Sequence, residues 1–199
     1  MTKFRFGAVP EDAKFDPEAE GWRSIREPNV YIYQLLAMPI GIVVCMALVV
    51  SFKFLGFLES IRFYFYSLGW EEAVAALIVM IVHEIVHGLT HPGWGLSSRT
   101  TLGIWPSKLV FFAHYEGEME RNRFLVVFLA PFLVLSMLPL LFAWATAVRS
   151  DWIPFVSVLN AAFASGDLLG FMLLGAQIPA NTLVRNKGYL SYWKEPPGI

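Results

Sequence analysis

Four stretches of the chain are long and apolar enough to cross a lipid bilayer, whose hydrocarbon core of about 30 Å requires about 20 mostly apolar residues in helical form. The first and third stretches, residues 31–52 and 124–148, contain no charged residue. The second, residues 71–90, has two acidic residues at its start and one glutamate deep inside, and the fourth, residues 152–178, holds a single aspartate. The pattern predicts an all-α membrane protein with about four transmembrane helices.

Two connecting segments depart from this pattern. Residues 53–70 are rich in Phe, Tyr and Leu but carry charges, which predicts a segment lying in the membrane interface. Residues 91–123 are interrupted by Gly and Pro and contain strand-like runs at 100–105 and 109–113. We therefore expect a short β-hairpin or a re-entrant loop between the second and third spans.

The composition favours lipid as the solvent. Hydrophobic residues make up 56% of the 199 residues and charged residues 16%, below the roughly 25% charged residues of soluble domains. The polar first 29 residues lack the apolar core of a cleavable signal peptide. We expect a cytoplasmic N-terminal segment (1–29), a membrane-embedded core (30–180) and a cytoplasmic tail (181–199). Cys45 is the only cysteine, so it can form neither an internal disulfide nor a cysteine-based metal site.

The distribution of basic residues predicts the orientation. Twelve of the 15 Lys and Arg residues lie in the N-terminal segment, the connection 91–123 or the tail. Cytoplasmic flanks of membrane helices retain Lys and Arg. Both termini are therefore expected in the cytoplasm, and no nucleic-acid partner is expected.

The second span contains the sequence His-Glu-Ile-Val-His at residues 83–87. Histidines four apart lie on one face of a helix and can chelate one ion, for which Zn²⁺ is the best match. Glu84 could then take the proton of a zinc-bound water whose pKa the metal has lowered. A chance match or interhelical hydrogen bonding is the alternative. Ionisable side chains cost about 2.5 to 3.5 kcal/mol each at the bilayer centre, so three of them in one span favour a metal site.

A catalytic zinc site needs a third protein ligand. Asp167 is the first candidate because it is the sole charge in the fourth span. At 1.5 Å per residue, His83 and Asp167 lie about 18 and 22 Å from the same side of the membrane. His91 and His114 are the two other candidates, with loop or supporting roles as their alternative.

Polar and small residues around Asp167 suggest further roles. Ala164, Ser165, Gly166 and Gly170 would let another helix approach closely. Asn160 lies seven residues before Asp167, on the same face, and could contact the substrate or an oxyanion or make an interhelical hydrogen bond. His114 is the other candidate for a substrate or oxyanion contact.

These motifs resemble the intramembrane metalloproteases of the site-2 protease type, in which His-Glu-x-x-His lies in one membrane helix and an Asp ligand, preceded by an Asn, in a later one. His83, Glu84, His87, Asn160 and Asp167 match in order and approximate spacing. Residues 83–88, 113–115, 129–131 and 165–167 are also similar to small bacterial membrane proteins described as zincin peptidases. The resemblance covers most of residues 70–190 and implies a bacterial cytoplasmic membrane location.

We therefore expect a zinc-dependent intramembrane endopeptidase. Glu84 would be the general base, the metal ligands would be His83, His87 and Asp167, and the substrates would be membrane-embedded or membrane-proximal polypeptides. By analogy, the strand-like part of the second connection could pair with an extended substrate. Two alternatives remain open: a membrane scaffold with a structural metal, and a metallohydrolase acting on a lipid or another amide. The sequence does not determine the oligomeric state.

Overall fold

The computed structural model describes residues 1–57, 69–146 and 148–196. Among them, three helical segments are long and apolar enough to cross a membrane: α1 (Val30–Phe54), α3 (Trp70–Thr90) and the continuous run Arg121–Ala145. That run comprises α4 (Arg121–Phe132), a π-helical turn η3 (Leu133–Met137) and α5 (Leu138–Ala145). The number of spans rises to four if α6 (Trp152–Phe163) and α7 (Ser165–Gln177), which meet at an angle of 48°, form one broken span.

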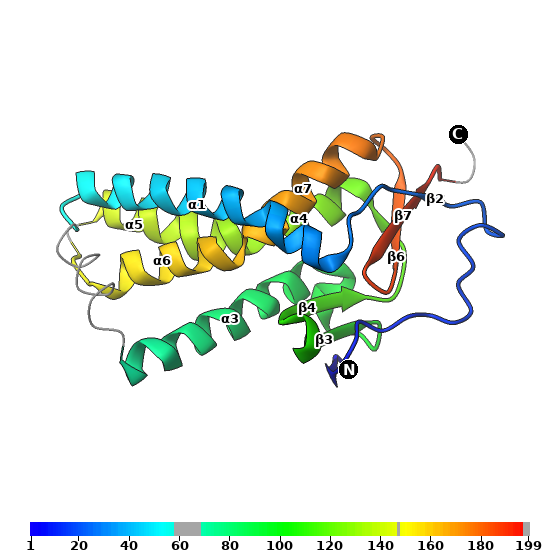
Figure 1. The fold of residues 1–199 in the computed structure, drawn as a ribbon, viewed down its shortest axis with the longest axis horizontal. Helices are drawn as coiled ribbons and strands as arrows, with labels where there is room; N and C mark the ends of the chain where they lie inside the picture. Colours follow the sequence, from blue (N-terminus) through cyan, green and yellow to red (C-terminus); the bar gives the residue numbers. More distant parts are fainter. Residues whose placement is uncertain (58–68, 147, 197–199) are drawn as a thin grey trace.

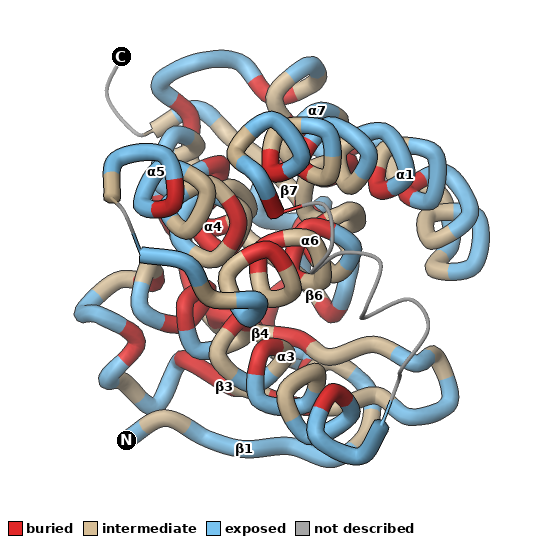
Figure 2. Tube along the Cα trace, turned by 90° about the vertical axis from the view of Figure 1, so that its left-hand side faces the viewer, coloured by how far each residue is buried: buried red, intermediate tan, exposed pale blue. Residues whose placement is uncertain are grey.

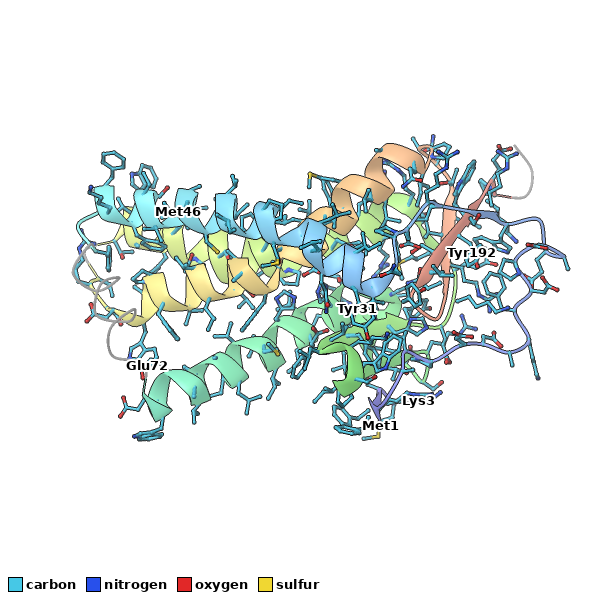
Figure 3. The ribbon with its side chains drawn as sticks, in the orientation of Figure 1. Met1, Lys3, Tyr31, Met46, Glu72 and Tyr192 are labelled. Carbon is cyan, nitrogen blue, oxygen red and sulfur yellow. The ribbon has the colours of Figure 1, made fainter. Side chains whose placement is uncertain are left out.

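The helices present apolar side chains outward. Only 22% of the residues are buried in the most apolar 18-residue stretch of α1 and in that of α3. Met38, Ile42 and Met46 of α1 are each more than half exposed. Side chains in the half of the molecule around Met46 are mostly carbon, whereas polar atoms gather near Lys3 and Tyr192 (Figure 3). An apolar outer surface on long apolar helices is the arrangement that a lipid environment stabilises.

The expectation of an all-α protein is wrong, because the structure also contains two β-sheets. The expected hairpin is present as β3 (Thr100–Trp105) and β4 (Val110–Tyr115), and β1 (Lys3–Phe6) pairs in parallel with β3. The second sheet has the order β2–β7–β6–β5, formed by Arg23–Ser24, Leu190–Lys194, Leu183–Lys187 and Met119–Glu120. These strands are at most six residues long and come mainly from the polar terminal segments, where no apolar span revealed them.

The N-terminal segment and the tail, expected as separate segments flanking the core, pair with each other through β2 and β7. Phe15 is 1% exposed and packs edge-on against Trp22 and Tyr192. Arg185 forms an ion pair with Asp12 at 2.7 Å. Both termini lie at the end of the molecule that holds the sheets (Figure 1).

One hydrophobic core joins this end to the helices. It combines residues of β4–β7, α4 and α7, and in the end-on view buried segments lie between the helices and the sheets (Figure 2). Its members include Tyr115, Leu125, Leu174 and Val184. The core therefore fixes the β-strands relative to α4 and α7.

The fourth apolar stretch, predicted as one span, is broken at Ala164 between α6 and α7. The small residues beside the break do permit close packing. A Cβ on Gly41 of α1 would lie 3.0 Å from the Cβ of Ser165, and a Cβ on Gly170 would lie 2.6 Å from the Tyr33 hydroxyl. The interfacial segment expected at 53–70 falls largely outside the described residues.

Candidate metal centre

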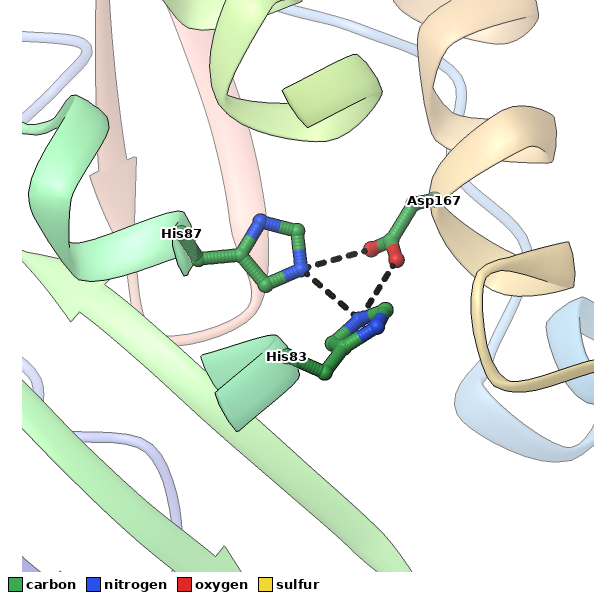
Figure 4. A group of neighbouring side chains, drawn as sticks. All are labelled: His83, His87 and Asp167. Atoms are coloured by element: carbon green, nitrogen blue, oxygen red, sulfur yellow. Dashed lines mark hydrogen bonds and ion pairs between the residues drawn. The ribbon is translucent and has the colours of Figure 1, made fainter. Parts of the chain in front are cut away.

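His83 and His87 lie one helical turn apart on the buried face of α3 (Figure 4). The helix is continuous from Trp70, where the Glu72 carboxylate accepts a hydrogen bond from the Gly69 amide at 2.8 Å. The two histidines are only 4% and 7% exposed. Their rings meet edge to face at 4.8 Å between centroids, so both Nε2 atoms point toward the same place.

Asp167 reaches that place from the first turn of α7, directly after the break at Ala164. Its Oδ2 lies 3.0 Å from His83 Nε2, and its Oδ1 lies 3.3 Å from His87 Nε2. The two Nε2 atoms are 3.1 Å apart. Within the described part of the chain these three side chains form the one group of ligand-type residues whose donor atoms all lie within 4.8 Å of one another.

The spacing of these atoms fits a zinc ion. Ligands bound at 2.0–2.2 Å in tetrahedral geometry are separated from one another by about 3.3 Å. The two histidine nitrogens are 3.1 Å apart, close to that value. The 3.0 and 3.3 Å separations end on different oxygens of Asp167, and one ligand atom from each of the three residues fits within 4.8 Å. Two neutral imidazole lone pairs and a carboxylate facing each other repel, because each is a hydrogen-bond acceptor. A cation between them removes the repulsion.

The remaining ring nitrogens of both histidines are held by the protein. His83 Nδ1 donates to Asn160 Oδ1 at 2.9 Å, and His87 Nδ1 donates to the Val127 carbonyl at 2.8 Å. With the proton on Nδ1, each Nε2 keeps its lone pair for a metal. The tautomer that zinc requires is thus set by groups on α6 and α4.

Pro131 makes the Val127 carbonyl available. In a regular helix the carbonyl of residue 127 accepts a hydrogen bond from the amide of residue 131. Proline has no amide hydrogen, so this bond cannot form in α4. The carbonyl accepts from His87 instead.

Asn160 lies behind His83 and does not line the cavity beside the metal group. It is completely buried, and its amide nitrogen donates to the Pro131 carbonyl at 3.0 Å and to Ser136 Oγ at 2.9 Å. With Oδ1 bonded to His83, every polar atom of the side chain is occupied. The interhelical hydrogen bonds expected as one alternative are present, and the contact with a substrate or an oxyanion stays a prediction.

Two arginines at the start of α4 tie the ligand-bearing helices together. Arg123 donates to the carbonyl of Thr90, the last residue of α3, and to that of His91, which follows it, at 3.0 Å each. Arg121 donates to the Gly175 and Ile178 carbonyls at the end of α7. Both helix C-termini, where unpaired carbonyls accumulate, are therefore capped by one neighbouring helix.

Glu84 stands beside the metal group with one oxygen unpaired. Its Oε2 is buried and makes no hydrogen bond to any described residue. The side chain lines a cavity of about 460 Å³ together with His83, Asp167 and His114, and also a second cavity of about 180 Å³ with His87. An unpaired buried carboxylate oxygen is costly, and the side chain that carries it lines both cavities.

His91 and His114 lie outside the metal group. His91 follows the last residue of α3 and is 1% exposed. Its Nδ1 lies 3.4 Å from Thr100 Oγ1. His114 is buried on β4 and lines the larger cavity. Burial lowers the pKa of His91 to about 3 and that of His114 to about 4, so both rings are neutral at pH 7.

The strand β4 forms one wall of both cavities. Phe111, Phe112 and Ala113 line the two spaces, next to Glu84 and Asp167. The sheet order β1–β3–β4 places β4 at an edge. Within the part of the chain that the structure describes, no strand pairs with the outer side of β4.

Residues 76–183, a little over half of the chain, match the sequence pattern of a family described as "putative zincin peptidase". The matched range contains both histidines, Glu84 and Asp167. Searches of curated proteins and of solved structures give no match.

Proposed function

The chain belongs to the family of putative zincin peptidases, and from this premise we propose that it is a zinc-dependent endopeptidase acting on membrane-embedded or membrane-proximal polypeptides. One observation carries the proposal: ligand atoms of His83, His87 and Asp167 converge within 4.8 Å of one another, next to Glu84, whose Oε2 is buried and has no partner among the described residues. Both groups open onto one cavity.

The proposed chemistry assigns a role to each side chain. His83, His87 and Asp167 would hold the metal, and a bound zinc ion supplies Lewis-acid polarisation and a more acidic water. The Glu84 carboxylate, which lines the cavity, takes the proton of the attacking water and gives it to the leaving amine. The neutral His114 ring, on the same cavity, donates a hydrogen bond to the substrate carbonyl oxygen.

The free edge of β4 is the proposed binding site for the substrate main chain. Edge strands present a row of unpaired amide and carbonyl groups, to which an extended peptide can add as a further strand. The sheet has two edge strands, β1 and β4, and β4 is the one whose residues line the cavities. A membrane helix must also unwind to be cleaved, and pairing with β4 replaces the hydrogen bonds that it loses.

The geometry favours a catalytic over a structural metal. Structural zinc sites are closed by four protein ligands, whereas catalytic sites retain an open position. The described residues supply three ligands, and Asp167 faces the cavity with its side chain 18% exposed. The strand edge beside the site favours a peptide over a lipid substrate.

The apolar helices support a location in the membrane, and we propose the bacterial cytoplasmic membrane. The excess of Lys and Arg in the terminal segments and the connection 91–123 favours a cytoplasmic position for the sheet-bearing end. The metal group would then lie within the bilayer, toward its cytoplasmic side.

Metal content is the first test of the proposal. Purified wild-type protein and Asp167→Ala are analysed by elemental mass spectrometry. We expect about one zinc per chain in the wild type, because three ligands match the usual catalytic set, and almost none in the variant. No metal in either protein would remove the basis for peptidase chemistry.

Proteolysis is tested with Glu84→Gln, which keeps the metal ligands and removes the base. New protein N-termini are compared by mass spectrometry in membranes containing the wild type or the variant. Termini found only with the wild type support the proposal. Identical termini combined with an altered lipid profile would favour the lipid-hydrolase alternative.

The proposed pairing of substrate with β4 is tested by changing the ligand and keeping the protein unchanged. A hydroxamate on an extended apolar tripeptide is compared with the same compound carrying N-methylated peptide bonds, which cannot pair with a strand. We expect the methylated compound to bind at least about tenfold more weakly, since several main-chain hydrogen bonds are lost. Acetohydroxamate, which binds zinc without a peptide chain, is the control. Equal binding of the two peptides would exclude pairing with β4.

A further inference from the structure

The hairpin formed by β6 and β7 faces the same cavity as β4. Its inner face is defined by the register, which pairs Val184 with Trp193 and Asn186 with Ser191. Side chains alternate along a strand, so these four lie on one side of the hairpin. Val184 is completely buried in the core beside Tyr115 of β4. Asn186, two residues further along β6, is therefore directed toward the space between the hairpins.

Asn186 borders both cavities of the metal centre. It lines the larger one with Glu84 and His114 and the smaller one with His87, and Asp167 lines both. Its Oδ1 is buried and receives no hydrogen bond from any described residue. Such an atom carries a desolvation cost. Glu84, which lines the same cavities, also has one buried oxygen without a partner among the described residues.

Hydrogen bonds of neighbouring residues fix the position of the β6–β7 hairpin around Asn186. Ser191, opposite Asn186, donates from its amide and its hydroxyl to the Glu27 carboxylate, at 2.7 and 3.1 Å. Arg185, the preceding residue, is fixed on the outer face by Asp12. The turn follows at Gly188, whose φ of +60° is easy only for glycine. Asn186 therefore cannot relieve its unpaired oxygen by a simple shift of the strand.

We propose that Asn186 is a substrate-binding residue that contacts the main chain of the peptide lying along β4. A primary amide offers one acceptor and one donor group, the same pair that a peptide unit offers. It can therefore accept a hydrogen bond from a substrate amide and donate one to a substrate carbonyl, whatever the side chains of the substrate are. The substrate would be an extended segment held between β4 on one side and the tip of the β6–β7 hairpin on the other.

This inference rests on the proposed peptidase function and extends it beyond the matched family region, which ends at residue 183. Aromatic side chains of both walls, including Phe112 and Tyr189, line the larger cavity. The class of substrate that fits is an extended polypeptide with apolar side chains, selected by its main chain. A folded helix would present no free main-chain groups to Asn186.

The test compares two zinc-binding probes on full-length zinc-loaded protein in detergent. The first is the apolar tripeptide hydroxamate, and the second is acetohydroxamate. For Asn186→Ala we expect about a threefold to tenfold weaker affinity for the tripeptide compound, corresponding to one hydrogen bond. The affinity for acetohydroxamate and the zinc content should remain those of the wild type.

Two further variants separate binding from structure. Lys187→Ala, which changes the adjacent residue on the opposite face of β6, should bind both probes as the wild type does. Asn186→Leu replaces an unpaired amide by an apolar side chain of similar size. Since no hydrogen bond to the protein's described residues is lost from Oδ1, its melting temperature should equal or exceed that of the wild type.

The outcomes distinguish this inference from the proposed function. If the wild type binds both probes and Asn186→Ala has the same ratio of affinities, Asn186 does not bind substrate. A marked fall in the melting temperature of Asn186→Leu would show a structural role and overturn the inference. If the wild type contains no zinc and binds neither probe, the proposed function itself fails.

Discussion

The two sides of the metal centre are built differently. On the α3 side, His83 and His87 are almost completely buried, and the second nitrogen of each ring is bonded to a group of the protein. On the α7 side, Asp167 is partly exposed to the cavity, and among the described residues its carboxylate oxygens form their ion pairs with the two histidines. Hydrogen bonds to neighbouring helices therefore orient the two histidines, whereas the Asp167 carboxylate interacts with the histidines themselves.

This difference indicates which part of the site is preorganised. The histidines have their orientation and tautomer before a metal arrives, because Asn160 and the Val127 carbonyl determine both. The carboxylate faces the cavity and can adjust its position as metal and substrate bind. The following four substitutions test this comparison, beginning with the largest expected effect.

Asp167→Ala removes a ligand. We expect the zinc dissociation constant to rise by more than about 100-fold, which exceeds the usual effect of losing a supporting contact. The measurement is competition with a chromophoric chelator. Near-normal affinity would mean that the α3 side binds zinc without α7, and the comparison would no longer describe one site.

Asn160→Ala removes the acceptor of the hydrogen bond from His83 Nδ1. We expect zinc affinity to fall by about 10-fold to 100-fold, because the ring loses the group that fixes its tautomer. Ser157→Ala is the matched control in the same helix. Ser157 Oγ donates to the Ser136 carbonyl at 2.8 Å and contacts no ligand. This control should cost about 1 kcal/mol of stability and leave zinc binding unchanged.

Pro131→Ala restores an amide hydrogen four residues after Val127. The new amide competes with His87 for the Val127 carbonyl, so zinc affinity should fall by about threefold to tenfold. Pro139→Ala, in the same span beyond the π-helical turn, is the control and should have no effect on affinity. An equal loss in both variants would point to a general change in the span.

Tyr33→Phe affects the α7 side and should have the smallest effect. The hydroxyl donates to the Gly166 carbonyl at 2.9 Å, next to Asp167 but not to its carboxylate. We expect zinc affinity to change by less than about threefold. If zinc affinity, measured in the same chelator assay, fell as much as in Asn160→Ala, then hydrogen bonds behind the ligand would matter equally on the α3 and α7 sides.

The sequence alone predicted the apolar helices and brought together the residues of the candidate site. Hydropathy identifies a helix that must face lipid, and an ionisable residue within such a helix stands out. His83, His87 and Asp167 were selected in this way, and the structure places them within reach of one ion. Their binding of zinc remains a prediction.

The supporting residues could not be read from the sequence, because their roles depend on packing between distant segments. The effect of Pro131 on His87 depends on the position of α4 beside α3, which no pattern in the sequence gives. Arg121 and Arg123 resemble interfacial anchors until the helix ends that they cap are seen. Asn186 lies in a short polar strand without any apolar pattern.

The separation of the ligands along the chain has a consequence for biosynthesis. His87 and Asp167 are 80 residues apart, so at about 5–20 residues per second the ribosome needs about 4 to 16 seconds to pass from one to the other. If α3 spans the membrane as proposed, it would enter the membrane during that interval with His83, Glu84 and His87 and without Asp167. A chain that stops before residue 167 keeps two members of the group and should therefore bind zinc more weakly than the full-length chain.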